Sequence, residues 1–251
     1  MQRFYQKEWH DIPLTACGKL SCRTLPDAAF YAAFYEAFFR KYSSLSGMPV
    51  PWTAQKKTWA DKVLSCLPAS SGPHVLSVGC GLGYLESVIL AQRPDIQLHC
   101  TEITDAPLRW LRPLLPEGRC HVGYAPDCLP PDLTFDVIYC GSIDYAMPDA
   151  LWRRLLEALR GRLRVGGGIL ILSASLWPDP PGSIASYVRC CRQIVRVLGP
   201  LLGLQAVQFW GWMRTVEENV ALCRKAGFPT LKYGPVGGDP HGLWIMAYPK
   251  P

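Results

Sequence analysis

Short apolar runs alternate with helix-like segments through the middle of the chain, and this alternation restricts the fold more than any other feature of the sequence. Strands that alternate with helices build a parallel sheet with helices on both faces. Because crossovers between parallel strands are right-handed, such a sheet is doubly wound. The sequence therefore predicts an α/β fold. Its first five strands are expected at residues 74–79, 96–102, 119–124, 135–141 and 166–175.

The last part of the chain is expected to complete this sheet. A helix is expected after Thr215, which forms the pattern of a capping box with Glu218 three residues later. Two strands, near residues 230–233 and 243–248, flank a turn rich in glycine and proline. An antiparallel hairpin at this point gives a mostly parallel, seven-stranded sheet in all.

Two segments fall outside the alternation. The first holds two expected N-terminal helices, one capped by Asp27 and the other by Thr53. The second is a helical insertion that follows the fifth strand, at residues 176–213. We therefore expect an N-terminal helical cap, residues 1–73, and a sheet domain, residues 74–251, that carries the insertion.

Composition narrows the class of protein. The 251 residues carry a formal net charge of +6, but the basic residues are scattered, so charge does not favour a nucleic-acid partner. The 11 cysteines form no C-x-x-C pair, which argues against a zinc site, and we expect reduced thiols. The first residues lack the apolar core of a signal peptide, and no apolar run is long enough for a membrane span. We therefore expect a cytoplasmic protein with no bound metal and no transmembrane segment.

A glycine-rich junction, "VGCGLGYLE", follows the first strand of the sheet. Gly79, Gly81 and Gly83 allow a sharp turn and a close approach of a ligand to the main chain, and the next helix offers free N–H groups. Such a junction favours a nucleotide-type ligand. The dinucleotide pattern G-x-G-x-x-G fails, because Tyr84 occupies its last glycine position, and no Gly-Lys-Ser/Thr follows for a phosphate loop.

The next strand ends in an acidic residue. Glu102 lies 19 positions after Gly83, where a carboxylate can accept both ribose hydroxyls of an adenosine. Ile103 then offers an apolar surface to a purine ring. Because the glycine loop contains no lysine or arginine, a cationic sulfonium ligand without phosphates fits it.

Together these features resemble the class I S-adenosylmethionine-dependent methyltransferases. The resemblance covers residues 74–250 and is carried by "VLSVGCGLG", "LHCTEI", "FDVIYCGS", "LRVGGGILILS" and a late helix with Arg214, Glu217 and "AGF". It identifies the sheet domain as a Rossmann-like class I methyltransferase domain and implies S-adenosyl-L-methionine as cofactor. The implied cofactor site consists of Ser77, Gly79, Cys80, Gly81, Gly83, Glu102, Ile103, Tyr124, Ala125, Cys140 and Gly141.

Two positions depart from the family pattern. Ser77 stands where the family usually has an Asp or Glu, an acid that helps to fix the amino end of the cofactor. No Asp follows the third strand in the position that bonds the adenine amino group, so Tyr124 or the backbone is expected to serve there. These departures leave open an alternative, a methyltransferase-fold protein with little or no turnover that binds a partner or a membrane surface. Its contact surface would be the basic amphipathic helix expected at residues 183–198.

The methyl acceptor is expected to be a small molecule. The segment before the glycine loop is similar to the lead-in segments of bacterial methyltransferases that modify natural products and glycans, and the N-P-P-Y-type motif of nucleic-acid methyltransferases is absent. The sequence therefore favours O-methylation of a natural product or saccharide over action on nucleic acid, and N-methylation of a small amine remains an alternative. The oligomeric state does not follow from the sequence.

Candidate catalytic residues follow from position. Tyr145 and Asp144 come after the fourth strand, where acceptor contacts gather, and His241 lies on the late hairpin loop. A general base is needed only for a weakly acidic acceptor such as an alcohol or a phenol. Lys56 and Lys57 are expected to lie in solvent.

Overall fold

The computed structural model describes residues 2–176, 208–237 and 241–250, together with isolated positions between 177 and 207. The helix expected at 183–198 lies largely outside the described residues, and so do its arginines. Among the described residues, no helix combines the length and the apolar character that crossing a membrane requires.

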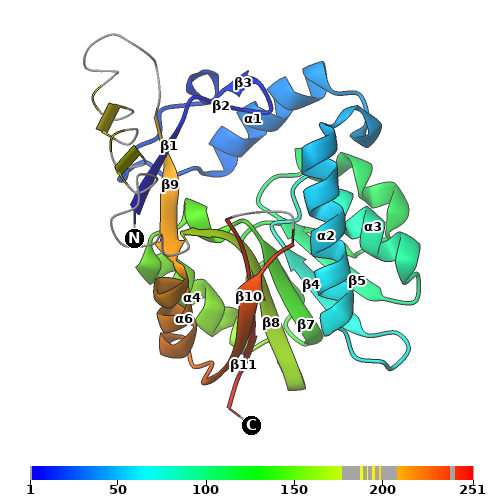
Figure 1. Ribbon diagram of the computed structural model, residues 1–251. Helices are drawn as coiled ribbons and strands as arrows, with labels where there is room; N and C mark the ends of the chain where they lie inside the picture. The colour runs from blue at the N-terminus through cyan, green and yellow to red at the C-terminus, as the bar shows by residue number, and fades with distance from the viewer. Residues whose placement is uncertain are drawn as a thin grey trace.

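The centre of the molecule is a sheet whose strands run in the order β6-β5-β4-β7-β8-β11-β10 (Figure 1). Strands β4 to β8 pair in parallel, while β11 pairs antiparallel with both β8 and β10. The predicted doubly wound sheet with a final antiparallel hairpin is therefore confirmed. The strands are β4 (His74–Val78), β5 (Gln97–Glu102), β6 (Cys120–Val122), β7 (Phe135–Gly141), β8 (Leu163–Leu176), β10 (Thr230–Pro235) and β11 (Gly242–Tyr248).

The strand order reverses at β4. This strand comes first along the chain in the parallel part of the sheet, yet it lies between β5 and β7. In open α/β sheets such a switch point leaves a crevice at the carboxyl ends of the strands, where ligands bind. The glycine junction identified in the sequence follows β4 and therefore lies at this crevice.

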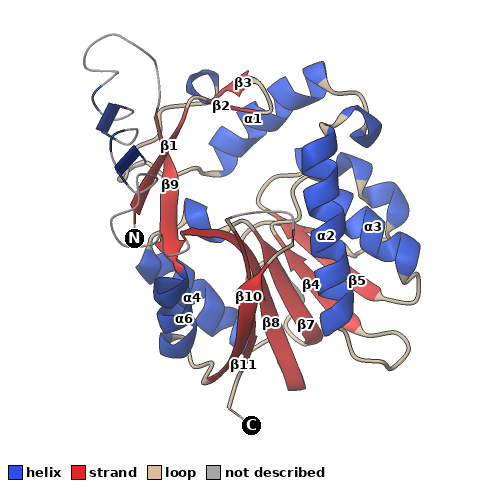
Figure 2. Cartoon of the chain, in the orientation of Figure 1, coloured by secondary structure: helices blue, strands red, loops and turns tan. Residues whose placement is uncertain are grey.

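Helices cover both faces of the sheet (Figure 2). Side chains alternate along β4, so Val75 packs with α2 and α3, whereas Leu76 and Val78 pack with α4 and α6. This alternation decides which residues meet at the site, because Ser77 shares its face with Val75. The helices are α1 (Ala28–Lys41), α2 (Val50–Cys66), α3 (Tyr84–Gln92), α4 (Asp149–Arg160) and α6 (Val216–Lys225).

Two further strands extend the sheet, and the sequence analysis missed both. β9 (Gln208–Thr215) pairs in parallel with the end of β8, and β1 (Gln2–Gln6) pairs antiparallel with β9. The prediction of a purely helical insertion at residues 176–213 is wrong for its last part. β9 is almost entirely buried, so its aromatic sequence shows no alternation of apolar and polar residues from which a strand could be recognised.

Helix caps agree in part with the prediction. Asp27 caps α1 by accepting from Phe30 N at 2.8 Å, and Thr215 and Glu218 form the expected capping box. Thr53, however, is not the N-cap of α2, which begins one turn earlier. Pro51 lies in that first turn, where a proline's fixed φ suits a helix and its missing N–H is not needed.

The alternation of strands and helices also predicts a helix at 106–115, after the second strand, but the structure has two short 3₁₀ turns there, Ala106–Trp110 and Arg112–Leu114. Prolines at 107 and 113 lack the N–H groups that a continuous α-helix needs.

The N-terminal part of the chain, residues 2–48, forms an aromatic cap segment. It comprises β1, the two-residue strands β2 (Glu8–Trp9) and β3 (Ile12–Pro13), and α1, which lies across the top of the molecule in Figure 1. Its buried side chains pack with Trp210 of β9 and with Leu82 of the glycine junction. α2, in contrast, packs on the sheet. The predicted domain boundary at residue 73 stays a prediction. Because α2 packs on the sheet and not on the aromatic cap segment, its packing favours a boundary before α2.

Candidate functional site

The glycine loop between β4 and α3 is closed in by side chains from other elements. Gly79, Gly81 and Gly83 all adopt positive φ, at 67°, 56° and 74°. A Cβ at Gly79 would lie 2.6 Å from Ile143 Cγ2, and one at Gly83 would lie 2.8 Å from Leu111 Cβ. The positive φ values and the lack of room for a Cβ therefore both require glycine at these positions. Because glycine has no side chain, the backbone of the loop is left open to a ligand.

Glu102 ends β5 and lies against this loop with only 7% of its surface exposed. Gly81 N donates to Oε2 and Ile103 N donates to Oε1, both at 2.9 Å. Burial raises the pKa of the Glu102 carboxyl, and the two hydrogen bonds oppose that rise. Each oxygen accepts one of these bonds and retains a second lone pair. The carboxylate can therefore fix the loop and still accept from two ligand hydroxyls.

A small pocket lies beside the loop, between β4, β7, α2 and the start of α3. Its polar lining includes Ser77, Glu86 and Tyr139. Ser77 and Tyr139 are register partners on β4 and β7, so their side chains lie on the same face of the sheet. Ser77 Oγ donates to Glu86 Oε1 at 2.6 Å, and Tyr139 OH donates to the same oxygen at 2.9 Å. A carboxylate thus lies beside Ser77, although it comes from α3 and not from β4.

Lys56 of α2 contributes an ammonium group to the same pocket. Its Nζ lies 3.9 Å from the ring centroid of Trp59 and 5.8 Å from that of Trp52. Burial lowers the pKa of Lys56 to about 8, and the charge of Glu86 acts in the opposite direction. The expectation that Lys56 lies in solvent is therefore wrong, whereas its neighbour Lys57 is exposed as expected.

Three tyrosines form an uncharged wall near the loop and Glu102. Tyr31 and Tyr35 come from α1, and Tyr145 follows β7. The Tyr35 hydroxyl lies 3.5 Å from the point that a Cβ on Gly81 would occupy. Burial raises the pKa of all three phenols, and the nearby charge of Glu102 adds to the rise. All three hydroxyls are therefore protonated at neutral pH.

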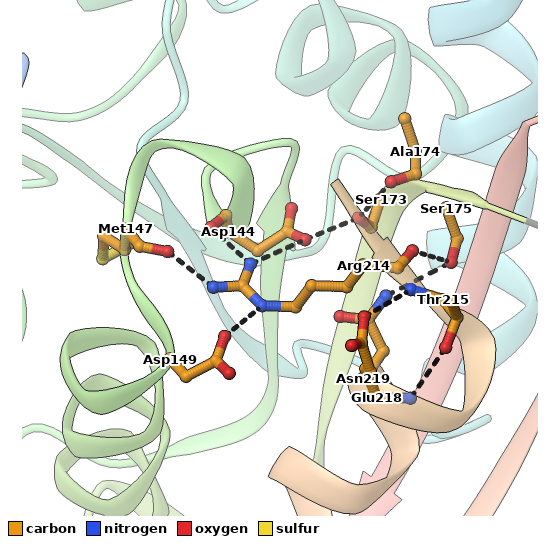
Figure 3. A network of polar contacts seen from close by, with 10 residues as sticks. All are labelled: Asp144, Met147, Asp149, Ser173, Ala174, Ser175, Arg214, Thr215, Glu218 and Asn219. Atoms are coloured by element: carbon orange, nitrogen blue, oxygen red, sulfur yellow. Dashed lines mark hydrogen bonds and ion pairs between the residues drawn. The ribbon is translucent and has the colours of Figure 1, made fainter. Parts of the chain in front are cut away.

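Asp144 belongs to a buried polar network, which Figure 3 shows from close by. Ser173 Oγ donates to Asp144 Oδ2 at 2.6 Å, and Arg214 Nη1 lies 3.8 Å from the same oxygen. Arg214 is fully buried; it donates to Asp149 Oδ1 at 2.8 Å and to the carbonyl oxygens of Asp144 and Met147 at 2.8 and 2.6 Å. These contacts engage Asp144 Oδ2, whereas Asp144 Oδ1 is buried and has no hydrogen-bond partner among the described residues. A catalytic role for Asp144 stays a prediction.

The remaining predicted residues occupy varied positions. The Cys140 side chain is 1% exposed and packs in the core with α4 and α6, away from the pocket, whereas Gly141 lines the pocket. Tyr124 is 61% exposed, and Ala125 is partly buried against the core. His241 is exposed at the carboxyl end of β8, where its carbonyl oxygen accepts from Ser175 N at 2.7 Å.

Residues 75–167 match the sequence profile of a family described as a methyltransferase domain. This matched segment contains the glycine loop and Glu102. No curated protein sequence gives a significant match.

Solved structures similar to this chain share its fold at low sequence identity. The mitomycin 7-O-methyltransferase MmcR is 16% identical, with a TM-score of 0.57 over 88% of this chain and 63% of its own. Human N-acetylserotonin methyltransferase, solved in complex with SAM, is 18% identical, with a TM-score of 0.57 over 89% of this chain and 56% of its own. A DhpI–SAH complex is 13% identical, with a TM-score of 0.59 over 90% of this chain and 96% of its own. The chain thus spans about three fifths of the length of the first two.

The fold brings some of the predicted site residues together and adds others. One pocket is lined by Ser77, Gly79, Cys80, Gly83 and Gly141. Glu102, at the end of β5, contacts Gly81 of the loop. The sequence analysis missed Glu86, Lys56 and Tyr139, which complete that pocket. One signal was present: Glu86 interrupts the otherwise apolar face of α3.

Proposed function

We propose that this chain is an S-adenosyl-L-methionine-dependent methyltransferase that acts on a hydroxyl group of a small molecule. The observation that carries the proposal is Glu102, a buried carboxylate at the switch point that holds the glycine loop and keeps a lone pair free on each oxygen. In this proposal Glu102 accepts the ribose hydroxyls, the loop backbone lies against the ligand, and Ile103 lies against the adenine. The cofactor supplies an electrophilic methyl group, and these residues bind and orient it.

The acceptor is proposed to lie beneath the aromatic cap segment, near the wall of Tyr31, Tyr35 and Tyr145. Uncharged hydroxyls and aromatic rings suit a flat, neutral molecule, and holding it in line with the methyl group lowers the barrier by positioning. The similarity to a mitomycin 7-O-methyltransferase supports a natural product as acceptor.

The side chains that could remove a proton from the acceptor indicate how acidic the acceptor hydroxyl must be. Because burial raises the pKa of Tyr145, its protonated hydroxyl can orient an acceptor but is poorly suited to remove a proton. Asp144 has its Oδ2 engaged with Arg214 and Ser173, and His241 lies at the carboxyl end of β8. These two residues remain the candidate bases. We therefore favour a phenolic hydroxyl, which loses its proton readily, over a sugar alcohol.

A cytoplasmic location is part of the proposal. All the cysteines that the structure describes have free thiols, which suits a reducing compartment.

The test measures binding before turnover. We expect calorimetry to detect S-adenosylhomocysteine binding to the wild type and about a tenfold or greater loss of affinity in Glu102→Gln, because a hydrogen bond to a charged group contributes roughly 1.5–3 kcal/mol. Glu102→Gln is preferred to Glu102→Ala because its amide oxygen keeps an acceptor for one of the two backbone N–H groups that donate to Glu102. Glu117→Gln, at an exposed position, is the matched control. Unchanged affinity in folded Glu102→Gln would contradict the role given to Glu102.

Transfer of a labelled methyl group then separates the alternatives. A panel of phenols, sugar alcohols and small amines is offered, and we expect label on the phenols. Label on amines alone would establish N-methylation instead. Tight cofactor binding with no label on any acceptor in the panel or in a cell extract would favour a binding protein without turnover.

A further inference from the structure

Glu102 is covered by the aromatic side chains of α1. It is 7% exposed, and it is not among the residues that line the pocket beside the glycine loop. Tyr35 is buried, and its hydroxyl lies 3.5 Å from the point that a Cβ on Gly81 would occupy, next to the N–H that donates to Glu102. Tyr31 lies close enough for the charge of Glu102 to contribute to the rise of its pKa. Because an adenosine is larger than either phenol ring, α1 must move before one can reach both carboxylate oxygens.

The aromatic cap segment is fixed to the rest of the molecule along β9. The first strand, β1, pairs antiparallel with β9 along its whole length. The side-chain amide of Gln208, at the start of β9, also binds the main chain of the cap, because it accepts from Leu20 N and donates to Gly18 O, both at 3.0 Å. Hydrogen bonds are directional, so this side of the cap has a defined geometry.

The opposite side of the cap meets the molecule through aromatic rings. Phe39 of α1 packs edge-on against Trp110, with ring centroids 4.9 Å apart, and the ring of His10 lies 5.7 Å from that of Trp52 on α2. Among the described residues, no hydrogen bond or ion pair joins cap residues 2–42 to α3 or to the turns after β5. Apolar contacts are non-directional, so this side can separate and re-form without losing a hydrogen bond.

The connection from α1 to α2 is long enough to permit such a movement. It consists of residues 42–49 and contains one 3₁₀ turn, Leu45–Gly47. A chain of this length spans up to about 26 Å when it is extended. Figure 1 shows α1 reaching from the paired β1 and β9 on one side of the molecule toward α2 on the other. The helix α1 can therefore rise from the site while α2 stays packed on the sheet.

We propose that the aromatic cap segment is a lid that turns about β9, opens to admit the nucleoside to Glu102 and closes over it. The inference rests on the proposed function, which supplies the nucleoside, and goes beyond it by assigning the cap a gating role. Closure returns Tyr35 to the glycine loop and excludes water from the site, as lids over active sites do. Because the same ring contacts form in the free and the liganded closed states, weakening them speeds binding and release together.

The first test measures the rate of S-adenosylhomocysteine binding by stopped-flow tryptophan fluorescence. If the lid must open first, the observed rate for the wild type reaches a plateau as the ligand concentration rises, and the plateau equals the opening rate. We expect Phe39→Leu, which removes the ring that packs on Trp110, to raise the plateau and the dissociation rate roughly 2- to 10-fold. The Kd should stay within about threefold. Tyr233→Leu, which removes an exposed ring on β10, is the control and should change neither rate.

The second test needs no ligand and measures amide hydrogen exchange by mass spectrometry. The N–H of Gly81 is held by Glu102 beneath the cap, so its exchange requires the cap to open. We expect Phe39→Leu to speed exchange in peptides that cover residues 79–83 by the same factor as the opening rate. Peptides from β1 and β9 should be unchanged, because these strands stay paired. Trp110→Leu removes the same contact from the other side and is measured alongside, so the test holds if one variant does not fold.

The outcomes separate the lid from the proposed function. A wild type that does not bind S-adenosylhomocysteine overturns the proposed function, and the exchange data alone then decide whether the cap is a lid. A binding rate that rises linearly with concentration, with rates and exchange unaffected by either variant, overturns the lid and leaves the proposed function standing. Equal acceleration of exchange in β1, β9 and residues 79–83 would show that the cap unfolds and does not turn, which also overturns the lid.

Discussion

At the scale of single residues, Arg214 and Glu86 differ in how many of their polar atoms the described residues pair. Arg214 donates to two carbonyl oxygens and a carboxylate and lies within reach of a second carboxylate, so it is fully engaged within the protein. Glu86 has the opposite character, with one oxygen bonded twice and the other not at all. The sequence alone does not distinguish the roles of Arg214 and Glu86, because each is an ionisable residue close to a motif.

Arg214→Met provides a test of this distinction. We expect it to lower the free energy of unfolding by about 3–5 kcal/mol, because it leaves Asp144 buried without its cation. Urea unfolding gives the value. Arg153→Met is the control, since Arg153 forms only an exposed ion pair with Glu157 at 3.7 Å and is expected to change stability by less than about 1 kcal/mol. Similar effects of the two substitutions would show that the buried network contributes little.

At the scale of elements, the sequence was informative where local pattern and packing agree. β7 was predicted with its observed bounds, because it is an apolar run between turn residues. α1 and α6 were predicted from their caps. β1 and β9 were missed, because a strand's partner far along the chain leaves no local pattern. The two 3₁₀ turns after β5 were read as one helix, although their prolines argued against it.

The packing of β9 against the turn after β7 leads to a second prediction. A Cβ on Gly211 would lie 2.0 Å from the carbonyl oxygen of Tyr145, which is backbone and cannot move away freely. We expect Gly211→Ala to cost about 1–3 kcal/mol of stability through overpacking and to displace Tyr145 from the acceptor wall. Thermal unfolding and methyl transfer are the measurements. Gly237→Ala, where a Cβ meets nothing within 4 Å, is the control, and equal melting temperatures for the two variants would refute the prediction.

At the scale of the whole molecule, the site is assembled from parts that only the fold brings together. The glycine loop and Glu102 could be predicted, because a short motif and a fixed spacing carry them. The pairing of Glu86 with Ser77 could not, because it depends on how α3 packs over β4 and β7. Lys56 required the position of α2 as well, and the tyrosine wall required the cap segment.

The whole fold should be sensitive to acid. Burial lowers the pKa of His10 and of His99 to about 4, from an ordinary value of 6.5. These two side chains therefore bind more protons in the unfolded chain than in the folded one between these values, so their contribution to stability falls as the pH drops from about 6.5 to 4. We expect urea midpoints to fall less over this range in a His10→Asn, His99→Gln double variant than in the wild type. Asn is chosen for position 10 because it tolerates the φ of 51° there. Parallel declines in the two proteins would contradict this.

The pairing of β1 with β9 has a consequence for the order in which the molecule is made. During synthesis the first strand leaves the ribosome long before its partner, and it has no edge to join until β9 emerges. Trp210, which packs in the aromatic cap, arrives with that same late strand. The sheet centred on β4 can begin to form earlier. The aromatic cap segment is therefore completed among the last steps of folding, after most of the crevice at the carboxyl end of β4 already exists.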